Sequence, residues 1–508
     1  MLKNRLLSLS ICTVASLAIF QAAYAQTSAF KITAIDAAAT DLFGNSVSID
    51  GDYAVVGAFL HDDNGSNSGS AYVFTWNGTI WMQQDKLLAL NGTADDKFGQ
   101  SVSISGDYAV AGANFDDDNG TDAGSAYVFT HTGTSWMQQA KLLPSDGTGF
   151  AWFGYSVSIS GDYTVVGASQ DNDNGTNSGS AYVFHRTGVS WVEEAKLLPS
   201  NGAANDRFGA SVSIDGDYAV VGAYWHDDNG TDAGSAYVFK RTGTSWAEEA
   251  KLLPSDGAAE DFFGASVSIS GDYIIVGAEL NDDNGSNSGS AYLFKRTGTS
   301  WAQQDKLLPS DGAMDDNFGQ SVSISGDYAV VGASSNNDNG NNSGSAYLFK
   351  RTGTSWAEVT KLLAFDAAAD DRFGISVSIS GDCTIVGALS DDDDGSESGS
   401  AYVFCGFTTP VGDVHEVTGL PTEFTLSQNY PNPFNPETVI EYTLPVRSDV
   451  KLTIYNLRGE EVALLINGTV PAGNHRVSWD ASGFASGVYI YKLIAGDFVQ
   501  TKKMLLLK

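Results

Sequence analysis

The sequence predicts an all-β protein in which seven similar antiparallel sheets close into a ring. The dipeptide Phe-Gly recurs seven times, always 55 residues apart, at Phe43, Phe98, Phe153, Phe208, Phe263, Phe318 and Phe373. A constant period of this length is typical of a repeat architecture. Glycine is abundant, with 56 residues, whereas there are only 11 prolines. That balance suits short strands joined by tight turns.

Each repeat contains four candidate strands. In the fifth repeat they are an alternating segment at 266–270, two apolar runs at 273–276 and 291–294, and a segment at 301–309 that contains Lys-Leu-Leu-Pro. Gly, Asn, Asp and Ser separate these segments, so each repeat predicts one antiparallel sheet. The fourth segment would also suit a short helix. We interpret it as the outer edge strand, where charged residues oppose edge-to-edge pairing.

The two ends of the repeat array predict that the ring closes. The seventh repeat stops at Phe404, before its fourth strand, and residues 29–35 match that missing strand. A first segment that completes the last sheet leaves no open end. We therefore predict a monomeric seven-bladed β-propeller, in which Val47, Ile49 and their counterparts pack between blades.

Charge and the N-terminus limit the possible partners and the location. The chain has 61 acidic and 27 basic residues, a net charge of −34, which excludes nucleic acid as a partner and favours divalent cations. Lys3 and Arg5 precede an apolar stretch at 6–20, and a small-residue motif predicts signal-peptide cleavage between Ala25 and Gln26. No later stretch is apolar and long enough to span a membrane, so we expect an exported chain without a transmembrane segment.

Composition divides the chain into four parts. We expect a signal peptide at 1–25, the propeller at 26–405, a linker at 406–422 and a small β-sandwich at 423–508. Seven of the eleven prolines lie after the last repeat, which marks the change from one domain to the next.

The repeat resembles the FG-GAP repeat of integrin α-subunit propellers and of many bacterial surface proteins. Phe-Gly is followed in each copy by Val-Gly-Ala or a close variant, and the resemblance covers roughly 28–404. One feature departs from the family. The family's calcium loop, Asp-x-Asp-x-Asp-Gly, precedes the Gly-Ala, whereas the acidic loop of this chain follows it. The family's metal sites therefore cannot be transferred to this chain.

The C-terminal segment closely resembles the type A sorting domain of type IX secretion substrates. The sequence Asn-Tyr-Pro-Asn-Pro-Phe-Asn-Pro at 429–436 and the ending Lys-Lys-Met-Leu-Leu-Leu at 502–507 carry the resemblance. It implies an immunoglobulin-like fold similar to that of the flagellar hook-capping protein. It also implies the outer-membrane secretion machinery of a Bacteroidetes-like bacterium as a partner, with removal of the domain and release or attachment of the chain at the outer cell surface.

The acidic loop after Gly-Ala is the candidate Ca²⁺ site of each repeat. Its central aspartates are Asp63, Asp118, Asp173, Asp228, Asp283, Asp338 and Asp393. In the second repeat, Asp116, Asp118 and Asp122 have a spacing that could place oxygen ligands around Ca²⁺. The alternative is a turn between the second and third strands, because Asp, Asn and Gly tolerate positive φ.

A second aspartate, two residues before Phe-Gly, is expected to cap the turn that enters the first strand. It occurs at Asp41, Asp96, Asp206, Asp261, Asp316 and Asp371, with Ala151 in the third repeat.

The candidate binding residues are those that differ between repeats. The positions directly after Gly-Ala vary most, and a single inter-strand loop places them on one face of the ring. The candidate contacts for an extracellular protein or glycan are Phe59, His61, Phe115, Tyr224, Trp225 and His226. Exposed aromatic side chains suit such contacts. The alternative is neutral variation in a solvated loop.

The sequence offers no catalytic signature. A nucleophile or carboxylate pair needs a singular site, yet almost every polar group is present in seven copies, and the six histidines show no metal-ligand spacing. We therefore expect an adhesion or interaction module and not an enzyme. The alternative is an extracellular propeller hydrolase that acts on a polymeric substrate, because propellers can assemble a site from a few dissimilar residues.

Cys383 and Cys405 are the two cysteines that follow the predicted signal peptide. Both belong to the seventh repeat and lie symmetrically about residue 394, so they face each other in an antiparallel hairpin centred there. Because the chain is exported to an oxidising compartment, we expect them to form a disulfide. Two unpaired thiols are the alternative.

Overall fold

The structure is a computed structural model of the whole chain, and it describes residues 28–407, 424–429, 432–445, 448–470, 473–496 and 498–507. All the secondary-structure elements assigned in these ranges are β-strands. The predicted signal peptide, with Ala25 and Gln26, and most of the predicted linker lie outside the described residues. The chain forms two compact units.

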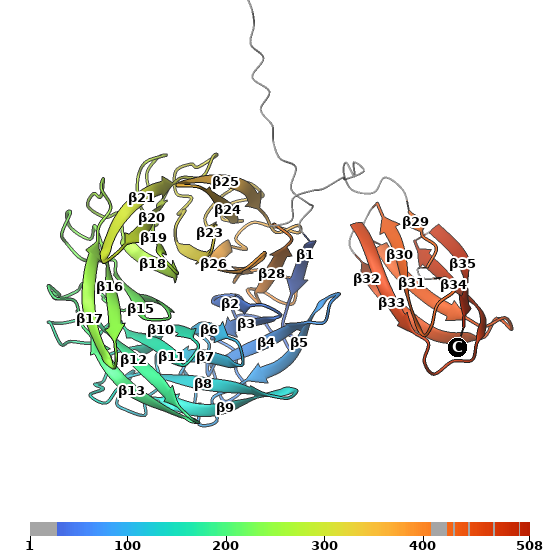
Figure 1. Cartoon of the computed structure of the whole chain (residues 1–508), viewed down its shortest axis with the longest axis horizontal. Coiled ribbons are helices and arrows are strands. Elements are labelled where there is room, and N and C mark those ends of the chain that lie inside the picture. Colours follow the sequence, from blue (N-terminus) through green and yellow to red (C-terminus); the bar gives the residue numbers. More distant parts are fainter. Residues whose placement is uncertain are drawn as a thin grey trace, which may run out of the picture. The chain divides into compact units, whose positions relative to one another are not determined.

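Seven four-stranded antiparallel sheets, or blades, form the propeller (Figure 1). Blade 1 contains β2 (Val47–Asp50), β3 (Tyr53–Ala58), β4 (Ser70–Trp76) and β5 (Trp81–Leu87). Blade 2 contains β6 (Ser101–Ser105), β7 (Tyr108–Ala113), β8 (Ser125–Thr132) and β9 (Ser135–Leu142). Blade 3 contains β10 (Phe153–Ser160), β11 (Tyr163–Ala168), β12 (Ser180–Thr187) and β13 (Ser190–Leu197).

The remaining blades repeat this order. Blade 4 contains β14 (Ser211–Asp215), β15 (Tyr218–Ala223), β16 (Ser235–Thr242) and β17 (Ser245–Leu252). Blade 5 contains β18 (Phe263–Ser270), β19 (Tyr273–Ala278), β20 (Ser290–Thr297) and β21 (Ser300–Leu307). Blade 6 contains β22 (Ser321–Ser325), β23 (Tyr328–Ala333), β24 (Ser345–Thr352) and β25 (Ser355–Leu362). Blade 7 contains β26 (Phe373–Ser380), β27 (Cys383–Ala388), β28 (Ser400–Cys405) and β1 (Ser28–Ile32).

Ring closure occurs as predicted, because β1 is the fourth strand of blade 7. It pairs with β28 in a register that places Lys31 opposite Tyr402, and Figure 1 shows the two strands side by side. The inner strands of blades 7 and 1 are also joined. Between blades 7 and 1, the Ile49 N–H donates to Ser378 Oγ at 3.2 Å. The equivalent bond between blades 1 and 2 runs from the Ile104 N–H to Ser48 Oγ, at 3.1 Å. The closing joint therefore has the same hydrogen bond as an ordinary joint. The fourth segment of every repeat is a strand, which confirms that interpretation.

The hydrophobic core lies between neighbouring blades. One cluster, for example, joins Val55 and Val73 of blade 1 to Val102 and Ile104 of blade 2. The two glycines of the repeat motif lie in the same joint: a Cβ atom on Gly57 would be 2.0 Å from the carbonyl oxygen of Gly99. The Phe-Gly and Val-Gly-Ala motifs therefore lie where adjacent backbones approach too closely for any residue but glycine.

The antiparallel order gives the propeller two faces. One face carries the start of each first strand, the loop between the second and third strands, and the exit from the fourth strand. We call it the loop face. Both the acidic loops and the variable residues after Gly-Ala lie there, so the candidate sites of all seven blades share one face.

The C-terminal unit is a small β-sandwich, as predicted. One sheet contains β29 (Thr425–Leu426), β30 (Glu437–Leu444) and β33 (Gly473–Asp480), and the other contains β32 (Glu461–Val470), β31 (Ser448–Tyr455), β34 (Gly487–Ala495) and β35 (Phe498–Leu506). Ile440 of the first sheet and Leu452 and Tyr491 of the second belong to one buried core. Asn429 of the Pro-rich motif is tied to it, because its backbone N–H donates to Tyr491 Oη at 2.8 Å. Across the ranges that the structure describes, no helix is long and apolar enough to cross a membrane.

Candidate functional site

Each predicted calcium aspartate lies against a lysine from the fourth strand of the same blade. The ion pairs are Lys86–Asp63, Lys141–Asp118, Lys196–Asp173, Lys251–Asp228, Lys306–Asp283, Lys361–Asp338 and Lys31–Asp393. We call these groups the lysine clusters. Blade 7 receives its lysine from β1, so the closing strand also completes the set of ion pairs.

Each lysine cluster joins two blades. In blade 5, Lys306 Nζ lies 4.8 Å from the ring centroid of buried Tyr292 and 2.8 Å from a carboxylate oxygen of Asp256, which follows the outer strand of blade 4. The other six lysines lie over the corresponding tyrosines. Part of the acidic excess is thus neutralised inside the joints between blades.

The acidic loops are closed by their own side chains. In blade 1, the Asn67 N–H donates to Asp62 Oδ1 at 2.8 Å, and the same bond closes the other six loops. This is the turn that the sequence offered as the alternative to a metal site. Asp36, His61 and Asp63 have the spacing of a metal site, but Lys86 forms ion pairs with both aspartates. Calcium binding stays a prediction, and at these loops it would require a lysine ammonium group to be displaced.

The buried aspartates before Phe-Gly cap the turn into the first strand, which confirms their predicted role. In blade 1, Asp41 Oδ2 accepts the Ala38 N–H at 2.7 Å, and five further blades repeat this bond. Burial raises the pKa of these carboxyl groups, to about 6 for Asp371. They are structural groups of the fold.

The structure separates the six predicted binding residues. His61 and His226 are only 8% and 5% exposed and belong to the lysine clusters of blades 1 and 4, where Lys86 Nζ and Lys251 Nζ each lie 3.4 Å from the imidazole Nε2. They differ from the surface position expected of them, because the backbone turns inward at this residue: the His61 N–H donates to the carbonyl of Ala58. Neither ring is available to a ligand on the loop face.

Three of the other four predicted residues belong to an aromatic–cation cluster on the loop face of blades 2 to 5, whereas half-buried Phe59 lies outside it. The members of the cluster, all half-buried, are Lys97, Phe115, Trp152, Tyr155, Arg207, Tyr224, Trp225 and Phe262.

The members form a continuous series of contacts. The ring centroids of Phe115 and Trp152 are 5.2 Å apart. Arg207 connects this pair to the next blade, because its guanidinium carbon lies 5.9 Å from the Trp152 ring and 4.8 Å from the Trp225 ring. Tyr224 lies 5.4 Å from Trp225. The cluster therefore presents ring surface and positive charge together, as a contact surface for a ligand does.

One carboxyl group belongs to the same region. Burial raises the pKa of Glu279, in the loop after β19, to about 7. The charge of Glu279 also affects the pKa of two nearby tyrosines, Tyr155 and Tyr224. Burial raises the pKa of Tyr155; the negative charge of Glu279 raises it further, and the positive charge of Arg207 lowers it. Burial likewise raises the pKa of Tyr224 to about 12. A carboxyl group with a raised pKa and a cation therefore lie in one region of the loop face.

Sequence reasoning missed five members of the cluster, namely Lys97, Trp152, Tyr155, Arg207 and Phe262. The available signal was the third repeat, which reads Phe-Ala-Trp-Phe-Gly-Tyr where other copies carry aspartate before Phe-Gly. The residue directly before Phe-Gly was a second signal, because it varies from Leu42 to Arg372 around the ring. That variation is as informative as the variation after Gly-Ala.

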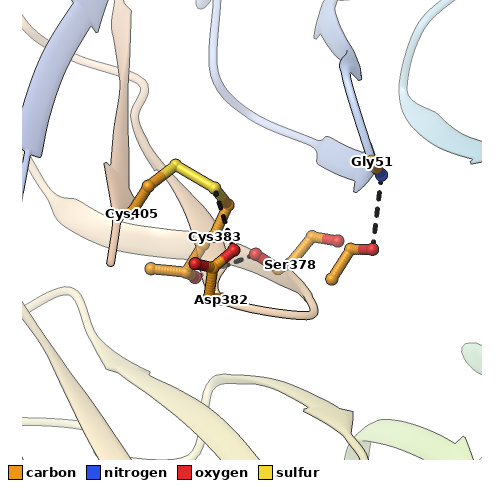
Figure 2. The surroundings of a disulfide bond; sticks show 7 residues. Gly51, Ser378, Asp382, Cys383 and Cys405 are labelled. Atoms are coloured by element: carbon orange, nitrogen blue, oxygen red, sulfur yellow. Dashed lines mark hydrogen bonds between the residues drawn. A yellow bond between two sulfur atoms is a disulfide. The ribbon is translucent and has the colours of Figure 1, made fainter. Parts of the chain in front are cut away.

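Cys383 and Cys405 are joined by a disulfide bond, shown in Figure 2. They are opposite each other in the β27–β28 pairing, which is the register expected for a hairpin centred on residue 394. The bond joins β27 to β28, the strand that receives β1. It therefore links two neighbouring strands of blade 7, the blade that closes the ring. Figure 2 also shows the backbone N–H of Gly51 in blade 1, which is hydrogen-bonded to blade 7 across the joint between these two blades.

A closed seven-bladed propeller whose repeat motifs lie in the blade joints, followed by a separate sandwich, defines the class of protein. The FG-GAP repeat model matches seven segments of the chain, at 27–74, 81–129, 136–184, 191–239, 246–294, 301–349 and 356–404. The chain belongs to the FG-GAP repeat family. The model of the secretion system C-terminal sorting domain matches residues 428–507. This type IX sorting domain implies export to the cell surface or the extracellular space, as in Bacteroidetes.

One similar solved structure is PorZ, an essential bacterial surface component of the type-IX secretion system of human oral-microbiomic Porphyromonas gingivalis. It is 12% identical in sequence, with a TM-score of 0.25, and the match covers 91% of this chain and 75% of that chain. A search of curated proteins found no match.

Proposed function

We propose that the chain is a secreted or surface-attached interaction module that binds an extracellular glycan or protein on the loop face of blades 2 to 5. The observation that carries this proposal is the aromatic–cation cluster. Its rings and cations are half-buried on a face that strands hold rigid, so little ordering entropy opposes binding. In the remaining blades the corresponding positions carry residues such as Leu42 and Asn317. That asymmetry favours a binding surface confined to one sector of the ring.

A binding role fits the polar groups better than catalysis does. The aspartates buried in the blade joints are engaged, either as caps such as Asp41 or as lysine partners such as Asp391. Bound calcium is the proposed cofactor only if the acidic loops release their lysines, and nothing in the binding proposal depends on it.

A second candidate function is hydrolysis of an extracellular polymer, and one observation favours it. Glu279, with its pKa raised to about 7 by burial, has the protonation behaviour of a general acid. Such an enzyme should lose activity above pH 7, as Glu279 becomes ionised, and Glu279→Gln should abolish hydrolysis. A panel of polysaccharide and peptide substrates, assayed from pH 5 to pH 9, tests this alternative.

The binding proposal is tested with wild-type protein and the double variant Trp152→Ala/Trp225→Ala. Both are applied to arrays of extracellular glycans and matrix proteins, and thermal melting shows that both are folded. We expect wild-type binding to at least one class of ligand and at least tenfold weaker binding by the variant, because each ring removed costs more than about 1 kcal/mol at a contact centre. Equal binding by the two proteins, or no binding to any ligand, would contradict the proposal.

A further inference from the structure

Arg207 and Arg372 differ from the other arginines of the propeller repeats. Four others form ion pairs with an aspartate of the same blade, namely Arg186–Asp162, Arg241–Asp217, Arg296–Asp272 and Arg351–Asp327. The side chains of Arg207 and Arg372 have no ion pair or hydrogen bond with any residue that the structure describes, but Arg372 is exposed whereas Arg207 is half-buried. The Nε of Arg207 is buried without a partner, as are those of Arg186, Arg241 and Arg351. The net charge of −34 repels polyanions at long range, so an anionic ligand would have to be held by close contacts with such cations.

The surroundings of Arg207 are aromatic. Its guanidinium group lies against the rings of Trp152 and Trp225, and the indole Nε1 of Trp225 is a second buried donor without a partner. Two blades away from Arg207, in blade 2, Lys97 Nζ lies 4.0 Å from the ring centroid of Phe115. A buried donor without a partner costs free energy, so a ligand acceptor at this place would recover a hydrogen bond.

We propose that the aromatic–cation cluster binds an acidic polysaccharide, with a sugar carboxylate on Arg207 and sugar rings against Trp152 and Trp225. The proposal rests on the binding function proposed above and names its ligand class. Guanidinium and carboxylate groups match in geometry and form charge-assisted hydrogen bonds. The apolar faces of sugar rings can cover the indole surfaces. An acidic sugar therefore matches both the guanidinium group and the aromatic rings of the site.

The extent of the cluster favours a polymer over a single sugar. Its contacts run from Lys97 in blade 2 to Phe262 in blade 5, across three blade joints. A chain that carries a carboxylate on each residue could reach both Lys97 and Arg207 while its rings contact the aromatic groups between them. A neutral glycan would leave Arg207 without an acceptor, so we expect the protein to discriminate by charge.

The test uses isothermal titration calorimetry on the chain with its sorting domain, with galacturonate hexamer and neutral maltohexaose as probes. We expect the acidic hexamer to bind at least tenfold more tightly, with an affinity that falls as salt is raised from 50 to 500 mM, because screening weakens ion pairs. Arg207→Gln should remove at least tenfold of that affinity. Arg372→Gln is the matched control, because Arg372 has the same place before Phe-Gly in blade 7 but is exposed and contacts no described aromatic ring.

The outcomes separate this inference from the proposed function. If both hexamers bind equally and Trp152→Ala/Trp225→Ala weakens both, the cluster is a binding surface but the acidic ligand class is wrong. If Arg207→Gln and Arg372→Gln lose the same affinity, Arg207 is not the carboxylate contact. Tight, Arg207-dependent binding of oligo-dT would overturn the saccharide assignment as well. A melting temperature for Arg207→Gln within 2 °C of wild type excludes misfolding as the cause of lost binding.

Discussion

The lysine cluster of blade 7 should contribute more to stability than that of blade 4, and two equivalent substitutions test this. Lys31 lies 3.0 Å from Asp366, 2.9 Å from Asp391 and 2.6 Å from Asp393. Asp391 is a buried carboxylate, with its side chain only 5% exposed. Replacement of Lys31 by Met keeps the aliphatic stem but leaves these carboxylates without their cation.

The expected magnitudes follow from burial. Removal of one partner from a buried ion pair costs about 3–5 kcal/mol, because the remaining charge stays uncompensated. Lys251→Met is the matched variant: Lys251 has the same repeat position and lies over Tyr237, but its acidic partner Asp228 has a side chain that is 33% exposed. Loss of that partly solvated pair should cost only about 1 kcal/mol. The cation–π contact is lost in both variants and cancels in the comparison.

Urea unfolding followed by tryptophan fluorescence measures the difference, because nine of the ten tryptophans lie in the propeller repeats. The sign of the pH dependence is also fixed. Burial alone would raise the pKa of Asp391, but ion pairing with Lys31 holds this pKa below its ordinary value. The stability that the pair contributes is therefore present above about pH 4 and is lost as the pH falls further. The gap between Lys31→Met and Lys251→Met should therefore shrink in acid. Equal losses for the two variants at pH 7 would refute the reasoning.

Three further predictions concern the frame of the propeller. Replacement of Cys383 and Cys405 by serine should lower the free energy of unfolding by about 3 kcal/mol, because the bond closes a loop of sequence separation 22; intact mass with and without reductant checks the bond, and two free thiols in the native protein would contradict it. A chelator or millimolar Ca²⁺ should leave the melting temperature unchanged, because lysine ammonium groups already pair with the loop carboxylates; a calcium-dependent rise of several degrees would show that the loops bind the ion. Gly57→Ala should lower the free energy of unfolding in urea by several kcal/mol, because the new Cβ would lie 2.0 Å from a backbone oxygen. Gly106→Ala, at a turn with open space around it, should lower it by only about 1 kcal/mol. Equal losses for the two variants would contradict the close approach of the two backbones.

Most of the fold was accessible from the sequence because it is local and periodic. The spacing of Phe-Gly gives the number of blades, and the missing fourth strand after Phe404 indicates how the ring closes. The opposition of Cys383 and Cys405 follows from one turn and the two-residue period of a strand. Each of these inferences needed only distances along the chain.

The partners of the acidic loops could not be read in the same way. Asp63 and Lys86 are far apart in sequence, and only the pairing of β4 with the outer strand and the loop closure bring their charges together. His61 illustrates the same limit. Its position after Gly-Ala suggested an exposed residue, but the turn directs it into the joint between blades. Pairing across strands decides which of two neighbouring loop residues is buried. The composition of the loop does not predict which one it is.

The residue before Phe-Gly shows how seven blades with the same backbone structure can present a ligand-specific surface. Its φ is positive in all seven repeats, from 54° at Leu42 to 58° at Arg207 and Phe262, although bulky residues rarely adopt this conformation. Backbone hydrogen bonds from the acidic loop hold it, such as the bond from the Arg207 N–H to the Asn177 carbonyl. The frame therefore fixes the backbone whatever the side chain is. Substitution at this position can change the ligand contact without altering the joints, and its aromatic and basic residues in blades 2 to 5 are where this chain departs from its own repeat.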